Sequence, residues 1–328
     1  MKKRNVIFLL SLALTLCACS APVELPDDDE FSVTTIKKTE VDTALSDSPK
    51  AVDPALLRDN TPVCLETSAP GLCVDGNDFA SVDYSNAKDG YIMVEYFGSS
   101  PKVKLQLVGP NGITYTYDIQ TGQAAFPLTS GAGDYEVSVC ENIEGTAYSL
   151  AYKGSFNVPE VSEFGPYLHP NQYVYFTQNC KTVAKGAELA ASCTNELDVV
   201  TNIYNYITKN ITYDYDKANN VKSGYISNVD EILDSGTGIC LDYSAVMTSM
   251  LRTQRIPTRL EVGYVGKDMV YHAWISVYIT DVGWLNGIIQ FDGKEWSLVD
   301  PTFGASTNER TLKEYIGDGT NYSTKYVY

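Results

Sequence analysis

The chain has 328 residues and a mass of 36.0 kDa, which is enough for about two domains. Its 44% hydrophobic and 20% charged residues are typical of a folded protein. The formal net charge of −17 argues against a nucleic-acid partner, because contacts to phosphate need clustered lysine and arginine, and against attachment to anionic lipid by charge alone.

The first residues have the pattern of an export signal. A positive Lys-Lys-Arg stretch at residues 2–4 precedes an apolar run of 11 residues at 6–16, which is too short to span a bilayer. The sequence LCACS at residues 16–20 resembles a bacterial lipoprotein signal, with Cys19 as the residue to be lipidated. We therefore expect residues 1–18 to be a lipoprotein signal peptide and the exported protein to be anchored to the outer face of a bacterial membrane. A plain secretory signal with incidental cysteines is the alternative.

The stretch after Cys19 lacks the apolar residues that a folded segment needs. It is rich in Ser, Thr and Asp and contains the run PDDDE, so it cannot bury enough apolar surface to offset the entropy lost on folding. We predict a disordered tether over residues 19–55, which would hold the rest of the chain away from the membrane.

Residues 60–158 have the pattern of short β-strands. Val103, Leu105 and Leu107 alternate with polar residues, and turn sequences such as GPNG at residues 109–112 separate the candidate strands. Strands are predicted at residues 91–97, 103–107, 114–119, 135–139 and 148–158. Short alternating strands at this spacing predict an antiparallel β-sandwich. No residue there suggests chemistry, so we interpret it as an accessory domain, either a spacer or an interaction module.

From residue 160 onward the pattern changes from strands to helices. Apolar residues recur at helical spacing over residues 197–211, with Asn195 as a candidate N-cap, and a second helix is predicted over residues 240–254. Strands are then predicted at residues 260–265, 271–279, 288–292 and 295–300. Helices followed by an antiparallel sheet predict an α+β domain over residues 160–328.

Export would place the cysteines where disulfides can form. Six cysteines follow Cys19: Cys64, Cys73, Cys140, Cys180, Cys193 and Cys240. Cys64 with Cys73, and Cys180 with Cys193, are the local pairs that would close short loops. Pairing cannot be deduced from sequence alone, and a fully reduced chain is the equal alternative.

The stretch GTGIC places Cys240 directly after two glycines and at the start of the second predicted helix. The free N–H groups and the dipole of a helix N-terminus favour a thiolate, and the glycines allow a sharp turn and a close approach of substrate. Such a position lowers a cysteine pKa to between roughly 3.5 and 7.5 and lets the backbone N–H donate to an oxyanion. A buried cysteine that only caps a helix is the alternative interpretation.

A histidine and an aspartate follow in patterns that suit a catalytic triad. Only two histidines are present, and His169 lies in a loop-like stretch beside a proline, which does not suit a catalytic role. His272 opens the strand pattern YHAWISVYI, which holds its side chain rigidly on one face. Asp300 ends the stretch EWSLVD before a proline, so it lies at a strand end where it can orient an imidazole.

These motifs, in this order, resemble the transglutaminase-like superfamily, whose members share a papain-like core. The resemblance covers residues 195–303 and rests on NYITKNITYDYD, GICLDYSAVMTSMLR, IPTRLEVGYV, YHAWISVYI and WSLVDPTF. It implies Cys240 as nucleophile, His272 as base and acid, and Asp300 as the orienting carboxylate. One departure is that many members carry a polar pair with an acid after HAW, whereas Ile275 and Ser276 stand here. The accessory domain lies outside the resemblance.

The expected activity is acyl transfer on an amide bond of a protein or cell-wall peptide. Cys240 would form a thioester with loss of an amine or ammonia. Water would then give proteolysis or deamidation, whereas an amine would give transglutamination, and the triad does not distinguish these outcomes. Tyr213 is a candidate second oxyanion donor, with a core tyrosine as the alternative.

No metal or cofactor is predicted, because the sequence has no Cys-x-x-Cys motif, no histidine cluster and no complete calcium loop. The expected partners are a protein or peptide substrate and, through the lipid on Cys19, a membrane. The competing hypothesis is a binding or scaffolding lipoprotein that keeps the fold without catalysis. The oligomeric state stays open.

Overall fold

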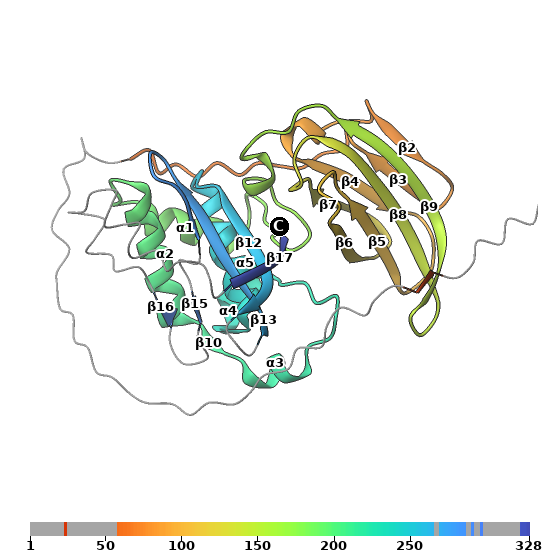
Figure 1. Ribbon diagram of the computed structural model, residues 1–328. Helices are drawn as coiled ribbons and strands as arrows, with labels where there is room; N and C mark the ends of the chain where they lie inside the picture. The colour runs from red at the N-terminus through yellow and green to blue at the C-terminus, as the bar shows by residue number, and fades with distance from the viewer. Residues whose placement is uncertain (1–22, 25–57, 266–268, 287–289, 292–295, 298–321) are drawn as a thin grey trace, which may run out of the picture.

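The structure is a computed structural model that describes residues 23–24, 58–265, 269–286, 290–291, 296–297 and 322–328 (Figure 1). The expected signal peptide, Cys19, nearly all of the tether and Asp300 lie outside the described residues. Within the described ranges, no helix is long and apolar enough to cross a membrane.

The first domain is an antiparallel β-sandwich, seen on the right of Figure 1. One sheet has the strand order β2-β3-β4-β7: Val74–Gly76, Ala80–Asp83, Tyr91–Tyr96 and Gly122–Pro127. The other has the order β1-β9-β8-β5-β6: Val23–Glu24, Ala147–Val158, Gly133–Glu144, Val103–Val108 and Thr114–Ile119. The five strands expected from sequence are present, and the sandwich prediction is confirmed. Strands β2, β3 and β7 were not expected, nor was β1, which lies in the stretch predicted to be a disordered tether and pairs with β9.

The alternating residues of β5 show why this chain segment forms a sandwich. Leu105 pairs with Val139 of β8 and Leu107 pairs with Val137, and all four side chains are buried. Period-2 alternation places such residues on one face of the sheet, where they pack against the second sheet.

The second domain packs helices against an antiparallel sheet, on the left of Figure 1. Its helices are α1 Lys181–Ala190, α2 Glu196–Asn210, α3 Tyr215–Asn220, α4 Val229–Ser235 and α5 Cys240–Thr253. The main sheet has the order β14-β13-β12-β17: Gly283–Asn286, Val270–Ile279, Thr258–Val265 and Tyr322–Val327. Two small pairs are β10 Thr212–Tyr213 with β11 Thr237–Gly238, and β15 Gln290–Phe291 with β16 Trp296–Ser297. Short 3-10 turns occupy Ala87–Asp89 and Gly165–Tyr167.

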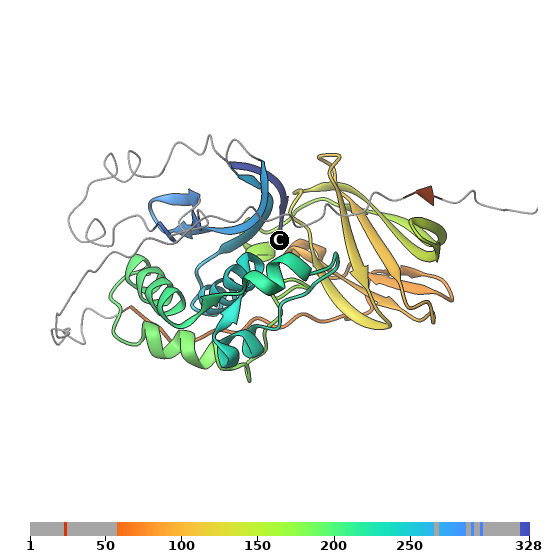
Figure 2. The same ribbon diagram turned by 90° about the horizontal axis from the view of Figure 1, so that it is seen from below.

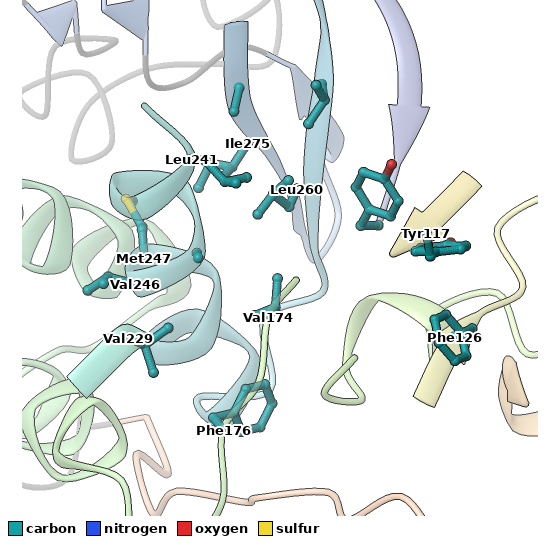
Figure 3. Packing of buried hydrophobic residues seen from close by; sticks show 14 of the residues in the cluster. Tyr117, Phe126, Val174, Phe176, Val229, Leu241, Val246, Met247, Leu260 and Ile275 are labelled. Carbon is teal, nitrogen blue, oxygen red and sulfur yellow. The ribbon is translucent and has the colours of Figure 1, made fainter. Parts of the chain in front are cut away.

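Both predicted helices are present. The side chain of Asn195 accepts a hydrogen bond from the N–H of Asp198 and caps α2, as the sequence indicated. Helix α5 is buried on every side. It contacts α1, α2 and α4 as well as β12 and β13. Figure 3 shows Leu241, Leu260 and Ile275 in the space between α5 and the sheet.

Arg252 joins the end of α5 to three other segments. Its side chain is fully buried and donates hydrogen bonds to the carbonyl oxygens of Thr258 (2.8 Å), His169 (2.6 Å) and Tyr328 (2.9 Å). Burial lowers the pKa of Arg252 to about 9. The guanidinium therefore stays charged at neutral pH and holds these carbonyls together.

The two domains share one hydrophobic core. The ring of Tyr117 in the sandwich lies 5.9 Å from that of Tyr328, and Thr129 donates to the carbonyl of Val327 at 3.1 Å. Figure 2 shows the marked C-terminus between the sandwich and the helices. In Figure 3, Tyr117 and Phe126 of the sandwich belong to the same buried cluster as Val246 of α5. The accessory domain is thus packed tightly on the second domain.

The two loop-closing disulfides suggested by the sequence are not formed, since all six described cysteines are free thiols. Cys180 and Cys193 flank α1, whose 10 residues span about 15 Å, whereas bridged Cα atoms lie within about 7 Å. Cys64 is half-buried near Cys180, while Cys73 is exposed just before β2.

Candidate active site

The turn before α5 depends on its two glycines. Gly236 ends α4 in the left-handed region, with φ of 63°, which is unfavourable for other residues. A Cβ on Gly238 would lie 2.7 Å from the Cβ of Asp242, closer than real Cβ contacts allow. The chain can therefore reverse direction tightly and begin the helix at Cys240.

Asp242, two residues after Cys240, stabilises this turn through hydrogen bonds of its side chain. Its carboxylate is fully buried and accepts hydrogen bonds from the N–H of Ile239 (2.9 Å), the hydroxyls of Tyr225 (2.7 Å) and Ser227 (2.5 Å), and the ammonium of Lys217 (2.7 Å). The ion pair with Lys217 neutralises the buried charge. The role of Asp242 was not predicted, because its only local signal in the sequence is an acid in the first turn of a helix.

The sulfur of Cys240 lies by an edge of β13, near the N–H of Ala273, the residue after His272. The N–H of Tyr278 donates to Pro257 on the β12 side of the strand at 2.9 Å. Because N–H directions alternate along a strand, the N–H of Ala273 points to the other edge. Among the described residues, β14 covers that edge only from Ser276 onward. The Ala273 N–H lies near the Cys240 sulfur there and acts to lower the pKa of its thiol.

Burial has the largest effect on the pKa of the Cys240 thiol and raises it. The low pKa expected from the position of Cys240 at a helix N-terminus is therefore wrong for this structure. Cys240 is 2% exposed, and burial raises its pKa to about 11, although the N–H groups of Ala273, Leu241 and Cys240 itself act in the opposite direction. The charge of Asp242 raises the pKa further. In this structure the thiol is protonated at neutral pH.

His272 is also neutral in this form. The residue is 8% exposed, and burial lowers its pKa to about 4. Its Nε2 is buried and has no hydrogen-bond partner among the described residues. A buried ring nitrogen without a partner is uncommon.

The strand around His272 explains the departure noted after the HAW motif. Ser276 lies on the same face as His272 and Trp274, and its hydroxyl donates to Glu261 of β12 at 2.5 Å. Glu261 lies directly opposite Trp274 and also accepts from Thr324 at 2.8 Å. A neighbouring strand therefore supplies an acid on this face.

Tyr213 lies beside Cys240. Strands β10 and β11 pair in parallel, with Tyr213 opposite Gly238, so the tyrosine is held next to the turn. Its hydroxyl oxygen faces the N–H of Cys240, and burial raises its pKa well above the usual value. The hydroxyl therefore remains protonated and able to donate. The Cys240 N–H, which we expected to face an oxyanion, lies near this hydroxyl.

Two residues singled out in the sequence, Asp300 and His169, are not part of the described site. Asp300 lies outside the described residues, so its position relative to His272 is not part of this geometry. His169 has its Nδ1 2.9 Å from the carbonyl of Gly165 and its ring centroid 4.9 Å from that of Tyr91. It is therefore a contact between the domains. The described residues contain no group of three or more His, Cys, Asp or Glu side chains that suits a metal ion.

Comparisons with known proteins agree with the fold. Residues 183–301 match the family model described as the transglutaminase-like superfamily. UPF0252 protein MJ1282 of Methanocaldococcus jannaschii is 31% identical over 90 residues, which are 24% of this chain and 26% of that protein. The chain thus spans about a quarter of that relative's length. Residues 183–301 therefore form a transglutaminase-like domain, and the family and fold class expected from the sequence are confirmed.

Two solved structures are similar at low identity. The protein named "Putative Cysteine Protease from Cytophaga hutchinsonii" has a TM-score of 0.34 and 17% identity, with 62% of this chain and 79% of that chain covered. Red sea bream transglutaminase has a TM-score of 0.28 and 14% identity, with 69% of this chain and 53% of that chain covered.

Proposed function

We propose that the protein is an exported lipoprotein enzyme that transfers acyl groups from amide bonds of proteins or peptides through Cys240. The observation that carries this proposal is the position of the Cys240 sulfur, at a helix N-terminus and against the N–H of the residue that follows His272. A nucleophile and a base on two rigid elements are the arrangement that covalent acyl transfer needs.

The reaction starts from a neutral thiol and a neutral imidazole, because burial opposes charge on both. As sulfur attacks the amide carbonyl, a C–S bond forms and the thiol proton passes to His272. The C–N bond then breaks, and His272 gives that proton to the leaving nitrogen. Water or a second amine attacks the thioester, and the thiol is restored.

Two further residues support these steps. Asp300 would accept a hydrogen bond from the Nε2 of His272, the buried nitrogen without a partner among the described residues, and would stabilise the imidazolium. Tyr213 would donate its hydroxyl to the oxyanion once the substrate oxygen competes for the Cys240 N–H.

Alkylation by iodoacetamide tests the proposal without a known substrate. Cys193 provides a matched control, because it is also 2% exposed and burial likewise raises its pKa to about 11. We expect Cys240 to react faster than Cys193 at pH 7, and His272→Ala to slow Cys240 alone, as read by peptide mass spectrometry. Equal rates for the two cysteines, unchanged in His272→Ala, would refute the proposal.

A second experiment separates hydrolase from transferase. Casein is incubated with the protein and a fluorescent primary amine, and mass spectrometry follows amine incorporation, deamidation and chain cleavage. Incorporated amine indicates a transglutaminase, whereas cleavage or deamidation alone indicates a hydrolase. Cys240→Ala should abolish either activity, and Cys193→Ala should retain it.

The catalytically silent alternative and the membrane anchor have their own tests. A scaffolding protein would keep its cellular role in a folded Cys240→Ala variant, whereas an enzyme would lose it. For the anchor, Cys19→Ser should move the exported protein from the membrane fraction to the soluble fraction. Retention of that variant on membranes would exclude lipidation at Cys19.

A further inference from the structure

A small cavity lies beside Leu241 and Ala273, the residues that come directly after Cys240 and His272 in the sequence. It has a volume of about 80 Å³, and its wall includes Leu241, next to Cys240, and Ala273, next to His272. A larger cavity of about 830 Å³, between the β6–β7 turn and the start of α4, includes neither of these residues. The small cavity is therefore the one connected with the proposed chemistry.

The wall of the small cavity comes from both domains. Val262 and Ala273 pair across β12 and β13 on the face of the sheet that also packs on α5, and Tyr271 lies on the same face. Tyr225 closes another side, and its hydroxyl is held by Asp242 at 2.7 Å. Thr116 of β6 adds a wall from the sandwich.

Interdomain contacts fix the sandwich wall in position. The ring of Tyr115, beside Thr116, lies 5.4 Å from that of Tyr326 in β17. Gly224, in the same loop as Tyr225, adopts φ of 79°, and Asp118 of β6 leaves no room there for a Cβ. The loop and β6 thus approach each other closely, and the cavity has a defined shape.

We propose that this cavity, which we name the side-chain pocket, binds an aliphatic side chain of the peptide substrate beside the reacting amide. The inference rests on the proposed function. Tyrosine rings and aliphatic side chains make its wall mainly apolar. At about 80 Å³ it is smaller than the cavity of about 150 Å³ that holds benzene, so a branched aliphatic group fits and an aromatic ring does not. The accessory domain thereby contributes to substrate selection.

Three alkylating reagents of different size test the pocket: iodoacetamide, N-isobutyl iodoacetamide and N-benzyl iodoacetamide. We expect Cys240 to react with the isobutyl reagent roughly tenfold faster than with either of the others, relative to free cysteine, because the pocket buries the branched group. The ratio of the isobutyl rate to the iodoacetamide rate is the quantity compared between variants.

Substitutions in the sandwich connect that ratio with the pocket. Thr116→Trp fills the pocket from β6 and should bring the ratio close to one; Thr116→Leu adds less volume and should lower it partly. Thr114→Trp is the matched control, since Thr114 lies on the same face of β6, is also half-buried and does not line the pocket. It should keep the wild-type ratio.

The outcomes separate the pocket from the proposed function. Equal rates for the three reagents, at a Cys240 whose labelling depends on His272, would overturn the pocket alone. Faster reaction of the benzyl reagent would overturn the aliphatic assignment. A Cys240 that no reagent labels, or whose labelling is independent of His272, would overturn the proposed function and with it the pocket's role.

Discussion

At the residue scale, two tyrosines buried in the sandwich differ in whether their hydroxyl group has a hydrogen-bond partner. Tyr117 Oη has no hydrogen-bond partner in the described part of the chain, whereas Tyr135 donates to the carbonyl of Gly131 at 2.7 Å. A buried polar group without a partner costs about 1–3 kcal/mol. Tyr117→Phe should therefore raise the free energy of unfolding by about 1 kcal/mol, and Tyr135→Phe should lower it by a similar amount. Urea denaturation measures both, and effects of the same sign would contradict this account.

His272 should make stability depend on pH. Burial lowers its pKa from 6.5 to about 4, so between these values the unfolded chain binds more protons than the native one. Stability should therefore be complete above pH 6.5 and should fall as the pH drops towards 4, by about 3 kcal/mol at 1.36 kcal/mol per pH unit. Urea unfolding at pH 7 and pH 4 should show a smaller loss in His272→Gln than in wild type. An equal loss in both would mean that His272 is not buried in neutral form.

At the element scale, the ion pair between Asp242 and Lys217 at the start of α5 should affect the pKa of the Cys240 thiol. Asp242 raises the pKa of Cys240, and Lys217 compensates its charge. Lys217→Met should therefore slow alkylation of Cys240 at a fixed pH, and Asp242→Asn should accelerate it, each by roughly threefold to tenfold. Rates measured from pH 6 to 10, with the double variant returning towards wild type, check the prediction. Loss of packing alone would change both single variants in the same direction.

Several elements could be predicted because their signals are local. The Asn195 cap and the alternation around His272 each depend on a few neighbouring residues, and the structure has both. Helices α1, α3 and α4 were missed because they are short, with 10, 6 and 7 residues. The reactivity of Cys240 was misjudged for a related reason: a helix N-terminus can be recognised locally, whereas burial under β13 depends on residues far along the chain.

The Asp242 network could not be predicted from spacing at all. Lys217, Tyr225 and Ser227 reach this carboxylate only after α3 and the segment between α3 and α4 fold over the start of α5. In sequence they are ordinary polar residues. Three motifs in order were enough to predict the family, but the groups that position Cys240 needed the fold.

At the scale of the whole molecule, the shared core should make the two domains unfold together. All three tryptophans, Trp274, Trp284 and Trp296, lie in the second domain, so their fluorescence reports only that domain. Phe126→Ala removes a fully buried ring from the sandwich and should cost about 3–5 kcal/mol. We expect the tryptophan transition to shift to lower denaturant together with the circular dichroism transition. A tryptophan midpoint unchanged by this substitution would show that the domains unfold independently.

The position of β17 also has a consequence for how the protein is made. Strand β17 pairs with β12, and Tyr328 packs against Tyr117 of the sandwich, so residues 322–328 complete both the sheet and the domain contact. At about 5–20 residues per second, a ribosome needs roughly 16 to 66 seconds to reach residue 328. Until then neither domain has all of its partners. The nascent chain therefore stays incompletely folded until residues 322–328 have been synthesised, which suits a protein that we propose is exported.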